Sequence, residues 1–241
     1  MNTNLSLILP CFNEEKNISF IYEEFSQIPF NNNKAELILV NNGSTDNTDK
    51  EIDKIININE KLNNNITIRK VLIKENAGYG GGIKAGLKMA NGDYIGWAHA
   101  DLQSPLIDFY RLYELIKDKK QIFGKGRRIN NRGFDGVISR LHEKIASTIL
   151  GFEMREINAQ PKIFSKDLML LFKNIPTKWT TIDTYAVYLC LKNQIEIKEI
   201  DVIFKNRIYG ESKWKNNFLI FIKHIFFNLL YLFKLRFFNE K

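Results

Sequence analysis

The sequence NAGYGGGIKAGLKMANGDYIGWAHADLQSP spans residues 76–105 and joins a glycine-rich helix entry to a short apolar run. Its first half predicts a loop that leads into a helix over 76–90, and residues 93–100 predict a buried strand. His99 and Asp101 stand two residues apart where that strand ends. We expect a core strand that ends in an imidazole and a carboxylate to face a ligand at that end.

Strands and helices alternate before this stretch. Apolar runs predict buried strands at 5–10 and at the start of 35–48, a third strand is predicted at 66–74, and helical spacing predicts an amphipathic helix at 14–28. This alternation predicts an α/β fold with a mostly parallel central sheet and helices on both faces. Such sheets bind ligands beyond the carboxyl ends of their strands, where the polar clusters CFNEE, NNGSTD, NAGYGGG and HADLQSP all fall.

The second half of the chain is less regular. The residues GKGRRINNRG at 124–133 predict a basic loop, and Pro161 predicts a turn or an edge segment. Helices are expected at 134–152 and 182–193, and a strand is expected at 195–204.

Composition narrows the class of protein. The 241 residues carry a formal net charge of +8, and their two cysteines, Cys11 and Cys190, have no metal-binding spacing. This argues against a disulfide framework or a structural zinc site and suits a reducing compartment. The opening residues MNTNLSLILP lack the pattern of a secretory signal and predict a first strand. A basic surplus fits nucleic acid, anionic lipid or a phosphorylated substrate.

The C-terminal stretch 218–238 is apolar and holds seven of the 18 phenylalanines. Polar residues interrupt it at Lys223, His224, Asn228 and Lys234. A membrane-spanning helix needs about 20 mostly apolar residues, so a helix lying in the membrane interface is expected instead. A helix buried in the domain or in a dimer is the alternative. The aromatic residues cluster here and are not interleaved with the basic ones, which argues against a nucleic-acid partner.

Two motifs allow more than one interpretation. Gly80, Gly82 and Ala85 match a loose dinucleotide-binding pattern, but they follow the third strand and not the first, so the match is weak. His99 and Asp101 fit a site for Mg²⁺ or Mn²⁺ that also takes water and substrate phosphates as ligands. Taken alone, they are more typical of a hydrogen-bonded, half-buried histidine and an aspartate at a helix N-cap.

Taken together, LILPCFNEE, ILVNNGSTDNT, the stretch 76–105 and RIYGESKW occur in an order that resembles family 2 glycosyltransferases. The resemblance covers about residues 4–215 and points to the GT-A fold and to the polyprenyl-phosphate branch typified by dolichol-phosphate mannose synthase. It implies a catalytic domain at 1–215 and a membrane-associated amphipathic helix at 216–241.

The resemblance also implies residues that bind the donor nucleotide. Asn41 and Asn42 match the pair that holds base and ribose, where the family commonly has two aspartates. The other residues that it implies for the donor are Pro10, Phe12, Asn13, Glu14, Gly43, Ser44, Asn76, Gly78, Lys84, Ala100, Gln103 and Arg127.

For the chemistry, the resemblance implies Asp101 as the principal ligand of a divalent metal cofactor, with His99 in the first position of the Asp-x-Asp motif. Arg207 and Lys213 match a basic pair near the substrate phosphates. Asp183 is a candidate base or acceptor contact, and a helix N-cap is its alternative. The segment NAQPKIF at 158–164 departs from the family pattern.

The implied function is inverting transfer of a sugar from a nucleotide-diphospho-sugar to a polyprenyl phosphate in cell-envelope glycan synthesis. A peripheral location on the cytoplasmic face of the membrane, with a membrane protein as a further candidate partner, goes with it. The alternatives are transfer to a hydroxyl of a lipid-linked glycan and an inactive scaffold. A dehydrogenase would need the glycine-rich loop after the first strand, where CFNEE stands.

Overall fold

The computed structural model describes residues 3–62, 65–130, 133–172, 174–176, 181–207, 209 and 218–237. Its strands are β1 (Leu5–Cys11), β2 (Ala35–Asn42), β3 (Ile66–Ile73), β4 (Tyr94–Trp97), β5 (Ile122–Arg128), β6 (Lys162–Ser165) and β7 (Glu196–Val202). Its helices are α1 (Ile18–Ser26), α2 (Thr48–Glu60), α3 (Gly78–Leu87), α4 (Ile107–Ile116), α5 (Gly133–Leu150), α6 (Thr181–Lys192) and α7 (Phe218–Phe237), with a short 3₁₀ helix at Lys166–Leu168.

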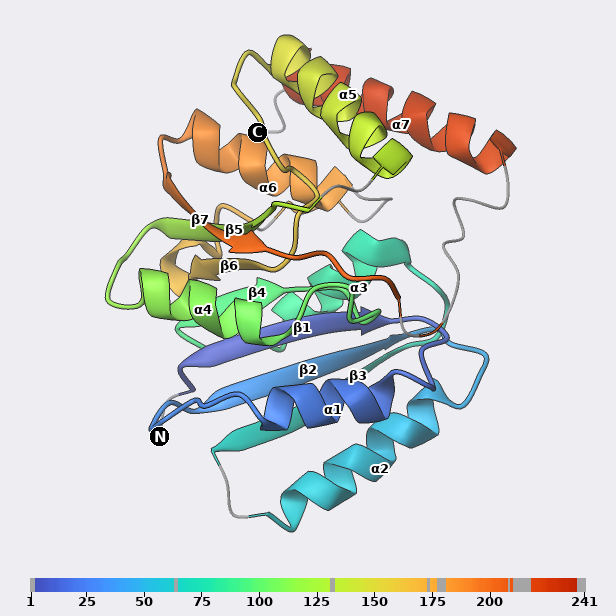
Figure 1. Ribbon diagram of the computed structural model, residues 1–241, viewed down its shortest axis with the longest axis vertical. Coiled ribbons are helices and arrows are strands. Elements are labelled where there is room, and N and C mark those ends of the chain that lie inside the picture. Colours follow the sequence, from blue (N-terminus) through green and yellow to red (C-terminus); the bar gives the residue numbers. More distant parts are fainter. Residues whose placement is uncertain are drawn as a thin grey trace.

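The strands form one sheet in the order β3-β2-β1-β4-β6-β5-β7 (Figure 1). All neighbouring pairs are parallel except those of β6, which runs antiparallel to both β4 and β5. The prediction of a mostly parallel sheet is therefore confirmed. The carboxyl ends of the other strands all lie at one edge of the sheet, because β5 and β7 run in the same direction as β4.

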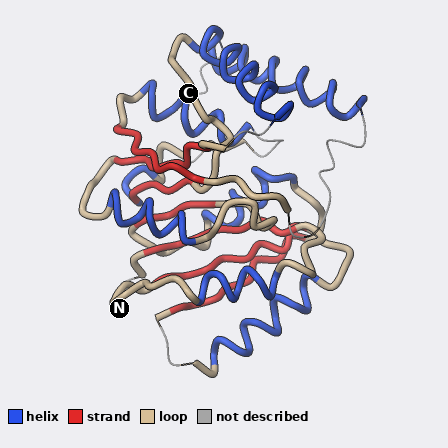
Figure 2. Tube along the Cα trace, viewed as in Figure 1, coloured by secondary structure: helices blue, strands red, loops and turns tan. Residues whose placement is uncertain are grey.

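The alternation of side chains along the strands builds a core on each face of the sheet. Leu5, Leu7 and Leu9 pack with apolar residues of α1, α2 and α4 on one face. Ile8 and Trp97 pack with those of α3, α5, α6 and α7 on the other. Helices thus cover both faces, as Figure 2 shows.

The glycines of α3 allow this helix to lie directly on β1. A Cβ atom on Gly82 would lie 2.7 Å from Cβ of Pro10, and one on Gly86 would collide with the side chain of Ile8. The glycine-rich residues are therefore inside the helix, which begins at Gly78, and two of them serve helix–strand packing. This accounts for the weak dinucleotide-like pattern without a dinucleotide.

Two predictions for the second half of the chain were wrong. The expected loop at 124–133 is largely β5, which extends to Arg128, and residues 131 and 132 lie outside the described part. Its glycines conceal the strand pattern, because a Cβ on Gly126 would collide with the carbonyl oxygen of Gln160. Pro161 is at neither a turn nor an edge: it follows a cis peptide bond and leads directly into β6, which lies inside the sheet.

The C-terminal helix α7 packs beside α5, and the two lie beyond α6 at the top of Figure 1. Arg236 Nη1 donates a hydrogen bond to the carbonyl oxygen of Leu150 at 3.2 Å, and the Tyr188 hydroxyl donates to that of Leu235 at 3.4 Å. None of the helices in the described ranges has the length and apolar character needed to cross a membrane.

Candidate active site

The loops after β1 and β2 are fastened to each other at the carboxyl edge of the sheet. Asn13 adopts a positive φ of 58°, and its Oδ1 accepts a hydrogen bond from the backbone N–H of Thr45 at 2.8 Å. The backbone N–H of Asn13 donates to Ser44 Oγ at 3.1 Å, and that of Glu14 donates to Thr48 Oγ1 at 2.9 Å. Residues far apart in the chain therefore form one rigid rim, with Asn13 exposed on it.

Asn41 and Asn42 lie under this rim, only 2% and 3% exposed. Asn41 donates to Asp49 Oδ1 at 2.9 Å and accepts from the backbone of Ser44. The Asn42 side chain accepts from the N–H of Ala77 at 3.0 Å and donates to the carbonyl oxygen of Gly78 at 2.9 Å. Both amides thus hold loops in place, and a direct contact of either with base or ribose stays a prediction.

Gly43 brings the loop after β2 against the one before α3. Its φ is +72°, and a Cβ atom there would lie 2.5 Å from the backbone nitrogen of Asn76. Asn76 in turn accepts a hydrogen bond from the N–H of Gly78 at 2.8 Å. Only glycine fits at position 43, because both the backbone angle and the close approach exclude a side chain.

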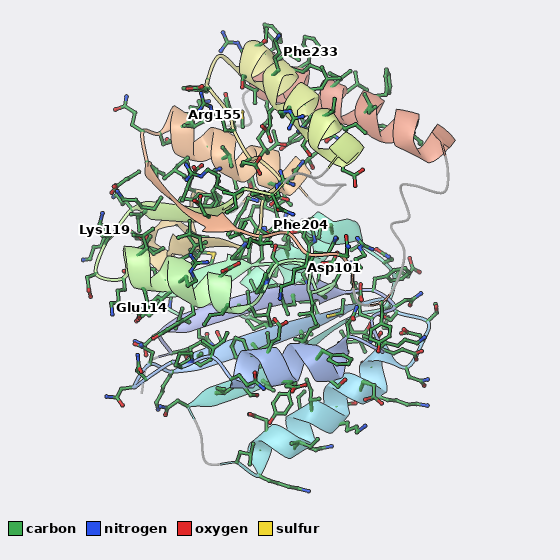
Figure 3. The ribbon with its side chains drawn as sticks, in the orientation of Figure 1. Asp101, Glu114, Lys119, Arg155, Phe204 and Phe233 are labelled. Atoms are coloured by element: carbon green, nitrogen blue, oxygen red, sulfur yellow. The ribbon has the colours of Figure 1, made fainter. Side chains whose placement is uncertain are left out.

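Asp101 and Arg207 meet at the same edge, and Figure 3 labels Asp101 there. Asp101 Oδ2 lies 3.0 Å from Arg207 Nη2, with the two side chains 8% and 31% exposed. The other carboxylate oxygen accepts from the backbone N–H of Gln103 at 3.2 Å. The segment after β7 therefore carries its arginine onto the loop after β4.

Gln103 holds that segment in place. It donates through Nε2 to the carbonyl oxygen of Lys205 at 3.0 Å, and the N–H of Lys205 returns a hydrogen bond to the carbonyl oxygen of Gln103 at 2.7 Å. Arg207 Nε donates to Gln103 Oε1 at 3.1 Å. Gln103 thus orients the guanidinium that pairs with Asp101.

Glu14 lies in the electrostatic field of this pair. Burial raises the pKa of its carboxyl group, the negative charge of Asp101 raises it further, and Arg207 lowers it in part. Asn17 Nδ2 donates a hydrogen bond to Glu14 Oε2 at 2.5 Å.

A divalent metal ion fits Asp101 only with ligands from a substrate. Within the described ranges, no three His, Cys, Asp or Glu side chains gather closely enough to hold a metal. Mg²⁺ and Mn²⁺ are commonly bound by one or two carboxylates together with water and substrate phosphates. One carboxylate at a strand end suits an ion that arrives with a diphosphate.

Asp183 lies inside the protein in α6, as the third residue of that helix and not as its N-cap. Its carboxylate is 2.9 Å from Lys162 Nζ, and these side chains are 1% and 0% exposed. Asp183 Oδ1 also accepts hydrogen bonds from Trp97 Nε1 at 3.1 Å and from Gln160 Nε2 at 3.2 Å. Asp183 is thus a buried partner of β4 and β6.

His99 lies between this buried cluster and Asp101. Its ring stacks on that of Tyr79, with the centroids 4.8 Å apart and the planes inclined by 25°. Tyr79 accepts a hydrogen bond through its hydroxyl from Gln160 Nε2 at 3.0 Å. Burial lowers the pKa of the His99 imidazole, and Asp101 offsets this in part.

Lys162 supplies a testable pH dependence. Burial lowers the pKa of its amine from 10.5 to about 8, in spite of the charge of Asp183. Between these two pH values the unfolded chain binds a proton that the folded protein has released, so the contribution of Lys162 to the free energy of unfolding rises with pH. We expect the wild type to gain stability relative to Lys162→Met from pH 8 to pH 10, measured by urea denaturation. A difference that falls over this range would show that the folded amine holds its proton more tightly than the unfolded one.

The other residues predicted to bind the donor nucleotide lie on several elements of the fold. Pro10 and Phe12 are half-buried beside the rim, Ala100 is buried, and Lys84 is half-buried on α3, six residues beyond Gly78. Arg127 is exposed on β5 and pairs with Asp201 at 2.6 Å. The structure does not bring it to Asp101 through any contact among the described residues. Lys213 lies outside the described residues.

The sequence prediction missed Tyr79, Gln160 and Lys162. Lys162 gave one usable signal, because a lysine at the start of the apolar run KIF is unusual in a central strand. Gln160 and Tyr79 gave none, since each is ordinary in its own segment.

Comparison with known proteins points to one family. The profile described as Glycosyl transferase family 2 matches residues 6–179. The chain is 26% identical over 229 residues to an undecaprenyl-phosphate 4-deoxy-4-formamido-L-arabinose transferase of Proteus mirabilis, covering 94% of this chain and 65% of that protein. It is also 26% identical to a dolichyl-phosphate beta-glucosyltransferase of Saccharomyces cerevisiae, covering 82% of this chain and 66% of that protein. The chain thus spans slightly less than two thirds of the length of these relatives.

Solved structures show the same fold. A mannosyltransferase from Pyrobaculum calidifontis in complex with GDP-mannose and Mn²⁺ superposes with a TM-score of 0.67 at 15% identity, over 93% of this chain and 62% of that one. Glucosyl-3-phosphoglycerate synthase from Mycobacterium tuberculosis, in complex with Mn²⁺, UDP and glucosyl-3-phosphoglycerate, gives 0.65 at 18% identity, over 97% and 80%. The GT-A fold is therefore confirmed. Because the family profile covers more than half of the chain, the protein belongs to glycosyl transferase family 2.

Proposed function

We propose that the protein transfers a sugar, with inversion, from a nucleotide-diphospho-sugar to a polyprenyl phosphate in cell-envelope glycan synthesis. The observation that carries the proposal is the contact of Asp101 with Arg207 at 3.0 Å, on the strand-end edge where the rim of Asn13 and Ser44 also lies. A carboxylate and a guanidinium side by side suit a diphosphate and its counterion. The names of the polyprenyl-phosphate relatives support the choice of acceptor.

In this reaction the protein must neutralise the charge of the departing diphosphate. Asp101 would hold a divalent ion, Mg²⁺ or Mn²⁺, which supplies Lewis-acid stabilisation of the leaving oxygens when bound. Arg207 would exchange its partner Asp101 for a phosphate oxygen, to which guanidinium bonds well. The acceptor attacks the anomeric carbon from the face opposite the diphosphate, so the configuration inverts.

The carboxylates of the described site favour an acceptor that needs no base. Asp101 pairs with Arg207, Asp183 is 1% exposed and pairs with Lys162, and Glu14 Oε2 accepts a hydrogen bond from Asn17 Nδ2 at 2.5 Å. A sugar hydroxyl would need a positioned general base, whereas a phosphate monoester is already ionised near neutral pH. This favours the lipid phosphate over the hydroxyl of a lipid-linked glycan.

A lipid acceptor requires access to a membrane, and α7 offers an apolar surface for it. Four of its side chains are exposed at helical spacing along one stripe: Phe226, Leu230, Phe233 and Phe237. Phe233 is labelled at the top of Figure 3. Leu232 and Leu235 point inward, and Lys223 and Lys234 are exposed. An aromatic stripe with flanking lysines suits the interface of an anionic membrane.

We therefore propose residues 1–215 as the catalytic domain and residues 216–241, of which the structure describes α7, as the segment that docks peripherally on the cytoplasmic face. Val137 and Leu141 of the neighbouring α5 are also exposed and would extend this surface. A membrane protein covering the same stripe is the alternative partner.

Placing charges on the stripe is expected to weaken membrane binding. Burial of one Phe is worth about 1.5–3 kcal/mol, so Phe226→Asp with Phe233→Asp should weaken binding to vesicles of phosphatidylcholine and phosphatidylglycerol about 100-fold or more. The control is Leu72→Asp with Leu170→Asp, at apolar positions that are 61% and 83% exposed elsewhere. Co-sedimentation with vesicles measures both pairs. Equal binding of the two pairs would rule out α7 as the docking surface.

The function itself is tested by a donor screen. The protein is incubated with Mn²⁺ or Mg²⁺, undecaprenyl phosphate in detergent and a panel of UDP-, GDP- and dTDP-sugars, and lipid products are identified by mass spectrometry. We expect a glycosyl phosphoprenol from one donor, dependent on the metal. Binding of a nucleotide sugar without lipid product would point to a hydroxyl acceptor, and absence of any binding would leave the scaffold alternative.

A further inference from the structure

Behind the strand-end edge, side chains from four separate segments form a continuous chain of contacts that ends at His99. It begins at the buried ion pair of Lys162 and Asp183, passes through the amide of Gln160 to the hydroxyl of Tyr79, and continues through the stacked rings of Tyr79 and His99. Lys162 begins β6, and Gln160 lies two residues before it. Asp183 belongs to α6, Tyr79 to the start of α3, and His99 to the loop after β4.

The chain of contacts has a defined direction. A carboxylate accepts hydrogen bonds and does not donate them, so the NH₂ group of Gln160 must face Asp183. The same nitrogen lies 3.2 and 3.3 Å from the two oxygens of Asp183 and 3.0 Å from the hydroxyl of Tyr79. The ion pair thereby selects the orientation of the amide, and the amide holds the phenol.

The anchor of this chain is enclosed. Gln160 and Lys162 are 0% exposed and Asp183 is 1% exposed. Trp97 Nε1 donates to the same carboxylate oxygen that faces Lys162. With both its oxygens engaged by donors of the protein, Asp183 has no path to an acceptor hydroxyl in the described structure, which argues against its role as a general base.

The other end of this chain of contacts, the half-buried His99, lies beside the reaction site. Tyr79 covers one face of the His99 imidazole, and His99 stands two residues before Asp101 in the same loop. The plane of the ring is therefore fixed relative to the carboxylate that pairs with Arg207.

We propose that Asp183, Gln160 and Tyr79 are positioning residues that fix the imidazole of His99 beside the donor diphosphate. The expected effect on turnover rests on the proposed function, whereas the positioning of His99 by these residues does not depend on it. Asp183 of the ion pair orients the Gln160 amide, and this amide holds the Tyr79 hydroxyl by a hydrogen bond. The Tyr79 ring in turn fixes the His99 ring by stacking.

The geometry is tested by NMR, which measures the histidine signals of the free, histidine-labelled protein. The chain has three histidines in all. Tyr79→Leu removes the ring current and so identifies the His99 signals. Tyr79→Phe keeps the ring and all buried charges but removes the hydroxyl, and we expect it to shift or broaden the His99 signals, as should Gln160→Leu. The matched control is Tyr94→Phe, which also loses one tyrosine hydrogen bond, to the carbonyl oxygen of Lys119 at 2.9 Å, and should leave His99 unchanged. Unchanged His99 signals in Tyr79→Phe would overturn the proposal.

The second measurement is the turnover rate, with the donor found in the screen and undecaprenyl phosphate as the two substrates. We expect Tyr79→Phe and Gln160→Leu each to lower kcat about tenfold with little change in the donor KM, and the double variant to be no worse than the poorer single one. Full additivity of the two effects, or a loss of stability with kcat intact, would contradict a shared positioning role. If no donor supports transfer, the proposed function fails, and the NMR result still decides the positioning of His99.

Discussion

Replacing Asp101 with asparagine is expected to lower the rate of sugar transfer about 1,000-fold, about 4 kcal/mol of activation free energy. Asparagine keeps the size of the side chain and can still accept the hydrogen bond from the N–H of Gln103 at Oδ1. It loses the charge that would hold the divalent ion and that pairs with Arg207. Steady-state kinetics over a range of Mn²⁺ concentrations measures the loss.

Asp108→Asn is the matched control for this variant. Asp108 is 4% exposed, against 6% for Asp101, and it also pairs with an arginine, Arg111, at 2.7 Å. Both members of this pair belong to α4, so the pair lies within one helix and not between the loops of the site. We expect normal turnover and a comparable loss of stability. Full activity of Asp101→Asn, or equal loss in both variants, would contradict the role of Asp101.

The second large effect is expected on stability, at the buried ion pair. Asp183→Asn and Lys162→Met should each lower the free energy of unfolding by about 3–5 kcal/mol, because each leaves a buried charge without its counter-charge in an enclosed site. The double variant removes both charges, and its asparagine side chain at position 183 keeps an acceptor for Trp97 Nε1. It should therefore recover most of the loss. Urea denaturation measures all three.

An exposed ion pair provides the comparison. Lys119 and Glu196 are 3.4 Å apart with side chains 44% and 50% exposed, and the loss of this pair should cost under about 1 kcal/mol. A double variant at Lys162 and Asp183 as unstable as the sum of its singles would show that packing, and not the unpaired charge, causes the loss.

The first half of the fold could be predicted from the sequence because each element carries its own pattern. The apolar runs of β1 and β2 are nearly continuous, since helices bury both faces of these parallel strands, whereas Arg69 and Lys70 interrupt the run of the edge strand β3. β5 and β6 lack this signal. The glycines of β5 leave room for Gln160 and Ile163, and β6 has only four residues after a proline. Their pairing depends on neighbours that the local sequence does not reveal.

The site, like the fold, could be predicted from the sequence only in part. The position of Asp101 at a strand end follows from local pattern, and so does the gathering of polar loops at one edge. The contacts that organise the site join residues far apart in the chain: Gln160 is 81 residues from Tyr79, and Trp97 is 86 from Asp183. A sequence pattern contains no information on such pairs, so it could not show that Asp183 is buried against Lys162 and Trp97 and is not an N-cap.

The most direct test of the proposed reaction compares two acceptors with the same lipid chain. With the donor found in the screen, the protein is given undecaprenyl phosphate or undecaprenol, and the product is measured by mass spectrometry with Asp101→Asn as the inactive control. We expect a glycosyl phosphoprenol from the phosphate and nothing from the alcohol, because Asp101 and Asp183 are each held by a cationic side chain. A glycosylated undecaprenol, formed by the wild type and absent in the control, would contradict the proposed reaction.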